Sequence, residues 1–134
     1  MKILTLSDVA HDLVYSPTVA ERFCDIDLVL SCGDLPFEYL EFVVSMLNKP
    51  LFYVFGNHAS RQLRFDDGST QYAPEGCISL HRRVVEYRGL LIGGLEGSMR
   101  YKPGDHQYTD LQMGWLTWAM APKLWRNRLR PVAV

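Results

Sequence analysis

The strongest constraint on the fold is a set of three short apolar runs in the first 55 residues. The runs occupy residues 3–6, 27–30 and 51–55, and each is nearly continuous instead of alternating between apolar and polar side chains. A strand that is buried on both faces has this pattern, whereas a strand with one solvated face alternates. The three runs therefore predict neighbouring strands of a parallel sheet.

Helical segments are expected between these strands. Ser16 is suited to cap a helix and Pro17 to occupy its first position, which predicts a helix over residues 16–23. Pro36 opens a second helical segment over residues 37–47, where apolar residues recur at helical spacing. The first half of the chain is therefore predicted to be a β-α-β-α-β unit.

The second half of the chain has a different pattern. Residues 78–87 and 89–95 predict two further strands, joined tightly at Arg88-Gly89. Thr109-Asp110 then cap a helix that we expect to end at Pro122. The apolar residues on one face of this helix are expected to belong to the core: Leu111, Trp115, Trp118 and Ala119. No linker divides the chain, so residues 1–134 are predicted to form one α/β domain.

Composition narrows the class of protein. With 48% hydrophobic residues, 22% charged residues and a net charge of −1, neither a disordered chain nor a nucleic-acid-binding surface is expected. No apolar run approaches the roughly 20 residues of a membrane span, and the first apolar residues are too few for a signal peptide. Cys24, Cys32 and Cys77 have no metal-ligand spacing, and we expect them to be small buried hydrophobic side chains. A cytoplasmic protein is the expectation.

Groups that bind cations follow each of the three predicted parallel strands. They are Ser7-Asp8, Gly33-Asp34 and Gly56-Asn57-His58. Because ligands gather at the carboxyl ends of parallel strands, the three segments are expected to converge on one crevice. In the alternative interpretation, Asp8 and Asp34 are turn or cap residues and His58 is an ordinary loop histidine.

Two carboxylates, an amide oxygen and an imidazole suit a site for divalent metal ions. One carboxylate can bridge two ions about 3.5–4 Å apart. Two such ions would offset the charge of a phosphate ester and activate water, and a nearby histidine could protonate the leaving oxygen. Manganese, iron, zinc and nickel all tolerate mixed oxygen and nitrogen ligands.

The order of these segments, each behind a hydrophobic strand, resembles the calcineurin-like metallophosphoesterase family, especially its bacterial members. The likeness is carried by residues 28–36 (LVLSCGDLP), 53–58 (YVFGNH) and 93–98 (GGLEGS). The resemblance implies the N-terminal half of the metallophosphoesterase α/β sandwich and hydrolysis of phosphate mono- or diesters with two divalent metal ions. It implies that Asp8 binds the first metal ion and that Asp34 bridges both. It also implies that Asn57 binds the second ion and that His58 contacts the phosphate or the leaving group.

The chain departs from the family pattern in two places. The family's first motif usually has one residue between its Asp and its His, whereas two residues separate Asp8 from His11, so His11 is the weakest ligand assignment. The family's later histidine motifs, which supply three further ligands, are absent, and only His81 and His106 remain. We therefore expect about half of a metal site, in a chain that has the pattern of a C-terminally truncated domain.

Two functions from different classes remain open. The first is a metal-dependent phosphoesterase acting on a phosphate ester, whose further ligands lie beyond residue 134 or on another chain. The second is a non-catalytic remnant that acts as an interaction module through the tryptophan-rich helix and the basic residues 123–130. An uncovered strand edge and an apolar helix face favour a homo-oligomer. Neither nucleic acid nor a membrane is an expected partner.

Overall fold

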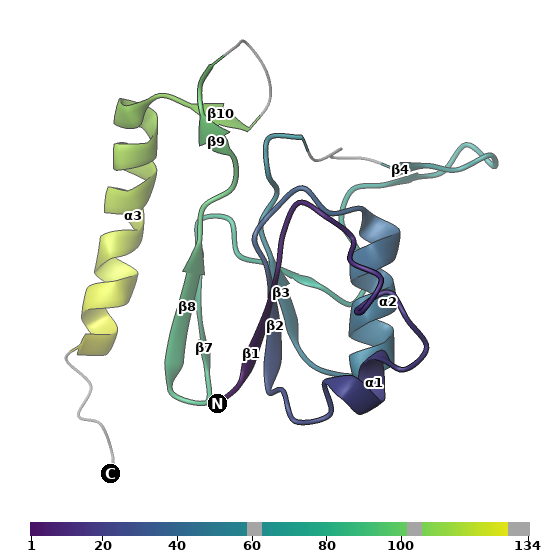
Figure 1. Cartoon of the computed structure of the whole chain (residues 1–134). Helices are drawn as coiled ribbons and strands as arrows, with labels where there is room; N and C mark the ends of the chain where they lie inside the picture. The colour runs from purple at the N-terminus through teal and green to yellow at the C-terminus, as the bar shows by residue number, and fades with distance from the viewer. Residues whose placement is uncertain (59–62, 102–105, 129–134) are drawn as a thin grey trace.

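The computed structural model describes residues 1–58, 63–101 and 106–128, the last three of them by their backbone. The fold is mixed α/β, as the sequence predicts. Figure 1 shows its parts side by side: helices α1 (Val19–Arg22) and α2 (Phe37–Leu47), a central sheet, a β-hairpin, and helix α3 (Asp110–Arg128).

The central sheet contains four parallel strands in the order β1-β2-β3-β6. The strands are β1 (Ile3–Leu6), β2 (Leu28–Ser31), β3 (Leu51–Tyr53) and β6 (Ile78–Ser79). Leu28, Val29 and Leu51 are fully buried, which explains the continuous apolar runs of β2 and β3. The predicted β-α-β-α-β unit is confirmed, although β3 ends at Tyr53 and not at residue 55.

The single strand expected over residues 78–87 is wrong, because this segment forms two strands. Its first residues form β6, and the rest form β7 (Arg83–Tyr87), which pairs in antiparallel fashion with β8 (Leu90–Gly94). Arg82 lies between them with a φ of 56°, in the left-handed region, where an extended strand cannot continue. The predicted tight turn between β7 and β8 is confirmed, since Arg88 and Gly89 have φ angles of 48° and 80°, as in a type I′ hairpin.

Helices α1 and α2 cover one face of the sheet. Helix α2 has the predicted bounds and is capped at its C-terminus by Asn48, a left-handed residue whose N–H donates to the carbonyl oxygen of Val44. Its buried Leu40 and Val43 belong to the larger core cluster, together with residues of β2 and β3. Each apolar side chain of this size that is removed from water stabilises the fold by roughly 1.5–3 kcal/mol.

Helix α1 is shorter than the predicted segment over residues 16–23. The N–H of Val19 donates to the carbonyl oxygen of Ser16 at 3.0 Å, so residues 16–19 form a turn. The hydroxyl groups of Ser16 and Thr18 also share a hydrogen bond of 3.1 Å. Thr18, and not Ser16, therefore stands at the start of the helix. Short polar side chains that bond locally compete in this way with helix formation.

The β7–β8 hairpin contributes to the second core cluster, on the other face of the sheet. The buried members of this cluster are Leu28, Phe52, Leu80 and Ile92. Asp27 connects the hairpin to the sheet, because its carboxylate pairs with Arg88 and its carbonyl oxygen accepts a hydrogen bond of 3.2 Å from the hydroxyl of Tyr87.

Helix α3 lies beyond the hairpin (Figure 1). Its predicted cap is confirmed: Thr109 Oγ1 accepts the N–H of Gln112 at 3.3 Å, and Gln112 Oε1 accepts the N–H of Thr109 at 2.9 Å. The expected end at Pro122 is wrong, because the helix continues to Arg128. Proline lacks an N–H, so it removes one helical hydrogen bond while the residues on either side keep theirs.

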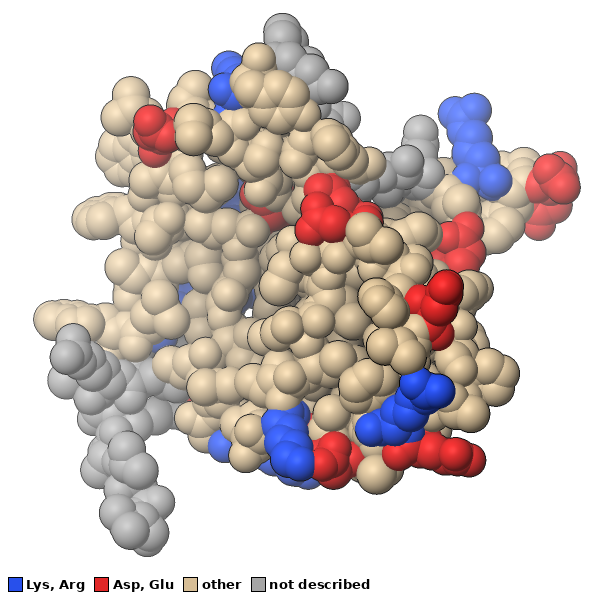
Figure 2. Space-filling model, in the orientation of Figure 1, with Lys and Arg blue, Asp and Glu red and all other residues tan. Residues whose placement is uncertain are grey.

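The expectation that the tryptophans of α3 belong to the core is also wrong. Leu111, Trp115 and Trp118 form an exposed face, called here the tryptophan face, on which the two indole rings are 70% and 72% exposed and meet edge to face at 6.1 Å. Among the described side chains of α3, Met120 is instead the buried one, and its Cε lies close to Gly93 of β8. Figure 2 shows little charge on the visible side of α3.

Four short strands complete the described part. They are β4 (Leu63–Arg64) and β5 (Thr70–Gln71), which pair with each other, and β9 (Ser98–Met99) and β10 (Gln107–Tyr108). Cys24 and Cys32 are exposed and Cys77 is half-buried, so the expectation of buried cysteines is wrong for the first two. Among the described residues, no helix has the length and apolarity required to cross a membrane. The side chains of residues 126–130, in the expected basic tail, lie outside the described part.

Candidate metal centre

The structure brings the ends of β1, β2 and β3 together at one edge of the sheet. The N–H of Asp8, beyond β1, donates to the carbonyl oxygen of Gly33 at 3.2 Å. The N–H of His58, beyond β3, donates to Asp34 Oδ1 at 2.8 Å. Parallel strands in register end at the same edge, which is why residues separated by about 25 positions in the sequence meet here.

Two glycines allow this close approach. A Cβ atom added to Gly33 would lie 2.9 Å from the Cα of Gly56, and Gly33 has a φ of 116°, which other residues rarely adopt. A Cβ atom added to Gly56 would lie 2.5 Å from Asp34 Oδ2, and closer still to Oδ1 and Cγ. Both positions therefore require glycine for the Asp34 carboxylate to lie where it does.

The two aspartates share an uncommon backbone conformation. Asp8 has a φ of 62° and Asp34 a φ of 57°. Asp8 is also the centre of a γ-turn closed by a hydrogen bond of 2.7 Å from the N–H of Val9 to the carbonyl oxygen of Ser7. A non-glycine residue with positive φ costs about 1–3 kcal/mol, and such residues gather at ligand sites. After both β1 and β2, the backbone adopts this conformation and turns sharply away from the sheet.

Asn57 and His58 share a partner that the sequence patterns did not identify. Asn57 Nδ2 donates to the hydroxyl oxygen of Tyr101 at 2.9 Å, and His58 Nε2 lies 3.2 Å from the same oxygen. Tyr101 is 44 residues from Asn57 in the sequence, and no local motif marks it. Asn57 is half-buried and His58 is exposed at the surface of the site.

His11 lies in the exposed turn between β1 and α1. Its Nδ1 accepts the N–H of Leu13 at 3.2 Å, and its carbonyl oxygen accepts the N–H groups of Val14 and Tyr15 at 2.9 Å each. One ring nitrogen is thus used within the turn, which leaves Nε2 as the atom with which His11 could bind a metal ion.

The residues at this edge fit part of a divalent metal site. The Asp34 carboxylate has about four acceptor positions, and the bond from His58 uses one of them. Asp8 would add a second carboxylate and Asn57 an amide oxygen, a donor set that suits hard and borderline cations. Among the described residues, however, no group of three or more His, Cys, Asp and Glu side chains is arranged to hold a metal ion. A metal ion bound at this edge would therefore need further ligands to complete its coordination.

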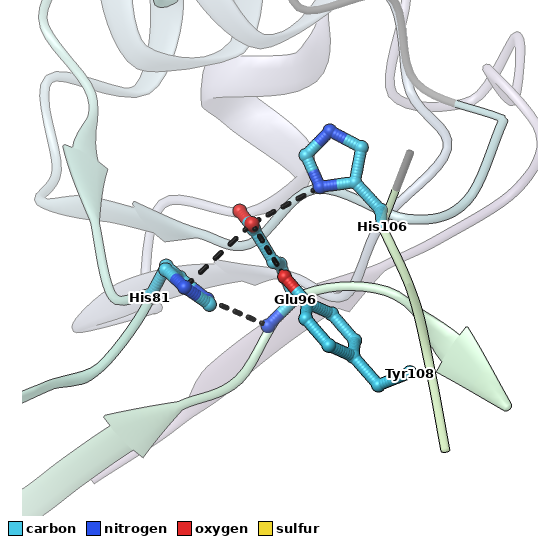
Figure 3. A network of polar contacts seen from close by, with 4 residues as sticks. All are labelled: His81, Glu96, His106 and Tyr108. Atoms are coloured by element: carbon cyan, nitrogen blue, oxygen red, sulfur yellow. Dashed lines mark hydrogen bonds and ion pairs between the residues drawn. The ribbon is translucent and has the colours of Figure 1, made fainter. Parts of the chain in front are cut away.

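Glu96, His81, His106 and Tyr108 form a second polar cluster, which the sequence patterns also missed (Figure 3). The buried carboxylate of Glu96 accepts a hydrogen bond of 3.1 Å from the hydroxyl of Tyr108, and its Oε1 lies 3.1 Å from His106 Nδ1 and 3.6 Å from His81 Nε2. His81 Nδ1 in turn accepts the N–H of Glu96 at 3.2 Å. Because the N–H and the carboxylate of Glu96 contact the two ring nitrogens of His81, this cluster has the pattern of a structural network.

Comparison of the chain with protein-family models, with curated proteins and with solved structures gives no match.

Proposed function

We propose that this chain carries part of the dinuclear metal site of a phosphoesterase that hydrolyses phosphate mono- or diesters. The observation that supports the proposal best is the hydrogen bond between Asp34 Oδ1 and the N–H of His58. It joins the second and third cation-binding segments at the edge where Asp8 also lies. The segments after β1, β2 and β3 each carry a side chain that can coordinate a cation, and all three strands end at one edge of the sheet. This arrangement favours a shared metal site over three unrelated turns.

Each residue has a distinct role in this proposal. Bound divalent ions would lower the charge repulsion around the phosphate and supply activated water. Asp34, which lies between the other two segments, would bridge the two ions, while Asp8 and Asn57 would each bind one. His58 would hold a proton at the exposed edge of the site and donate it to the leaving oxygen.

Manganese binding tests the metal site. Titration calorimetry should show that the chain binds Mn²⁺ and that Asp34→Asn abolishes measurable binding, since the bridging carboxylate serves both ions. Asp67→Asn is a matched control, because Asp67 is an exposed carboxylate of the β4–β5 turn, and it should leave binding unchanged. His11→Ala should matter less than Asp34→Asn. Equal binding by the wild type and Asp34→Asn would exclude the proposed centre.

Hydrolysis of a generic aryl phosphate and of its bis-ester under added Mn²⁺ tests the enzymatic part. We expect negligible turnover for the 134-residue chain, because its described residues supply an incomplete set of ligands. In a form that has the remaining ligands, His58→Ala should lower turnover by roughly 10²–10⁴-fold, the usual contribution of general acid catalysis. Unchanged turnover would refute the role of His58.

A non-catalytic interaction module is the second candidate function. The exposed tryptophan face favours it, because contiguous apolar surface of this kind is typical of interaction sites. Under this alternative, Asp34→Asn would change neither metal binding nor any partner interaction, whereas a polar substitution on the tryptophan face would abolish association.

A further inference from the structure

We propose that Tyr101 is a positioning residue of the candidate metal centre, which orients the side chains of Asn57 and His58. The inference rests on the proposed function, because it concerns how that site is arranged before a metal ion binds. The observation behind it is that two adjacent residues of the site converge on one hydroxyl oxygen.

The first consequence concerns the amide of Asn57. Only the amide oxygen can bind a cation, whereas the NH₂ group repels one. Asn57 Nδ2 donates to the Tyr101 hydroxyl at 2.9 Å, so the nitrogen end of the amide is fixed toward Tyr101. The oxygen end is thereby turned away from Tyr101 and presented for a metal ion. Without this bond the amide can rotate, and part of the population presents the wrong end.

The second consequence concerns the imidazole of His58. The hydroxyl oxygen of Tyr101 has two acceptor positions, so beside the bond from Asn57 it can accept a second bond from the Nε2–H of His58, 3.2 Å away. This arrangement holds the ring in place with Nε2 as the donor toward Tyr101, so Nδ1 is the nitrogen from which His58 gives its proton in the proposed function. A histidine that contacts substrate or metal is commonly fixed by such a bond to its other nitrogen.

Tyr101 is itself held in place by hydrogen bonds from backbone N–H groups to β10. Its N–H donates to Gln107 Oε1 at 3.3 Å, and the N–H of the preceding Arg100 donates to the carbonyl oxygen of Tyr108 at 2.9 Å. The N–H of Gly97 donates to the carbonyl oxygen of Phe55 at 2.8 Å, two residues before Asn57. The bond from Gly97 connects the segment around Tyr101 to the loop that carries Asn57 and His58, and the other two connect it to β10.

The buried Glu96 cluster holds the start of the same segment in place. Glu96 directly precedes Gly97, and its carboxylate contacts His106 and Tyr108 on the returning chain (Figure 3). Backbone and side-chain bonds of this segment therefore fix the position of the Tyr101 hydroxyl. Burial does not fix it, because the ring is 62% exposed. Polar partners that orient metal ligands in this way typically contribute 10–100-fold in metal affinity.

The test compares Tyr101→Phe with Tyr72→Phe in the whole chain. Both substitutions remove only a hydroxyl group from an exposed ring, but Tyr72 follows β5, outside the candidate centre. Titration calorimetry with Mn²⁺ alone should give about 10-fold weaker binding for Tyr101→Phe and unchanged binding for Tyr72→Phe. The ¹⁵N chemical shifts of the His58 ring should indicate protonation at Nε2 in the wild type and change only in Tyr101→Phe.

The outcomes separate this inference from the proposed function. If the wild type binds Mn²⁺ and Tyr101→Phe binds it equally well, with unchanged His58 ring shifts, the positioning role is overturned while the metal centre stands. If the wild type takes up no Mn²⁺, the proposed function fails, and the positioning of metal ligands fails with it. Thermal melts of both variants should coincide with that of the wild type, because the removed hydroxyl is at the surface.

Discussion

Substituting Gly56 by Ala should damage the candidate centre without straining the backbone. The φ of Gly56 lies outside the left-handed region, so alanine is allowed there, but the new methyl group would overlap the Asp34 carboxylate. Asp34 Oδ1, which accepts the N–H of His58, would lie closest to the new methyl group, and even the more distant Oδ2 would have to move from 2.5 Å to at least 3.4 Å, about 0.9 Å. A displacement of this size breaks the bond of 2.8 Å from the N–H of His58.

The magnitude follows from the lost bond. A hydrogen bond to a charged group contributes about 1.5–3 kcal/mol, and water replaces part of it because Asp34 is only half-buried. We expect Gly56→Ala to lower the free energy of unfolding by about 1–2 kcal/mol. In a chain of this length that corresponds to a decrease in Tm of roughly 3–10 °C. Affinity for Mn²⁺ should fall as well, since the carboxylate that we propose to bridge the two ions is displaced.

A double-mutant cycle measures the predicted clash directly. In an Asp34→Ala background the three atoms nearest to the new methyl group are gone, so Gly56→Ala should cost close to nothing in urea unfolding. Gly114→Ala is the matched control, because a Cβ atom there meets nothing within 4 Å, and it should stabilise α3 by up to about 1 kcal/mol. An equal cost of Gly56→Ala in both backgrounds would refute the steric argument.

Three further predictions concern other parts of the molecule. The backbone N–H of Lys2 and the charge of Arg88 lower the pKa of Asp27 below its usual value, so the stability it contributes is present above about pH 4 and is lost as the pH falls through the lowered pKa. Urea unfolding should therefore show Asp27→Asn destabilised at pH 7 but equal to the wild type near pH 2. Burial, assisted by the charge of Glu41, raises the pKa of Cys77 to about 12. Iodoacetamide at pH 8.5 should therefore modify Cys24 and Cys32 rapidly and Cys77 at least roughly 100-fold more slowly. Equal modification rates of the three thiols would contradict this. Light scattering should show self-association that Trp118→Gln reduces, since that ring is exposed on the tryptophan face, and a monomeric wild type would disprove it.

Local patterns were sufficient to predict the first half of the fold. β2 and β3 are covered on both faces, so their apolar runs identify them without knowledge of their partners. Helix α2 is amphipathic and packs on the sheet, so its spacing gives its bounds. The meeting of Asp8, Asp34 and the segment from residue 56 to 58 then follows from the common edge of parallel strands.

Non-local contacts explain what the sequence did not predict. The backbone of Arg82, whose N–H bonds to Gly94, separates β6 from β7, and no composition signal marks that residue. Helix α3 buries Met120 and exposes Trp118, although the size of tryptophan favours the opposite choice. The side-chain partners of Glu96 and of the Tyr101 hydroxyl lie 10 to 44 residues away, so only the folded chain brings them together.

The central claim, that the ends of three strands share a divalent metal site, is tested most directly by paramagnetic mapping. Mn²⁺ is titrated into the ¹⁵N-labelled chain at substoichiometric amounts, and the broadening of each backbone amide signal is recorded. The amides of residues 7–9, 33–35 and 56–58 should broaden first and together, and Asp34→Asn should remove this pattern. Broadening that begins around Glu96 or in the β4–β5 turn, or its absence at millimolar Mn²⁺, would contradict the claim.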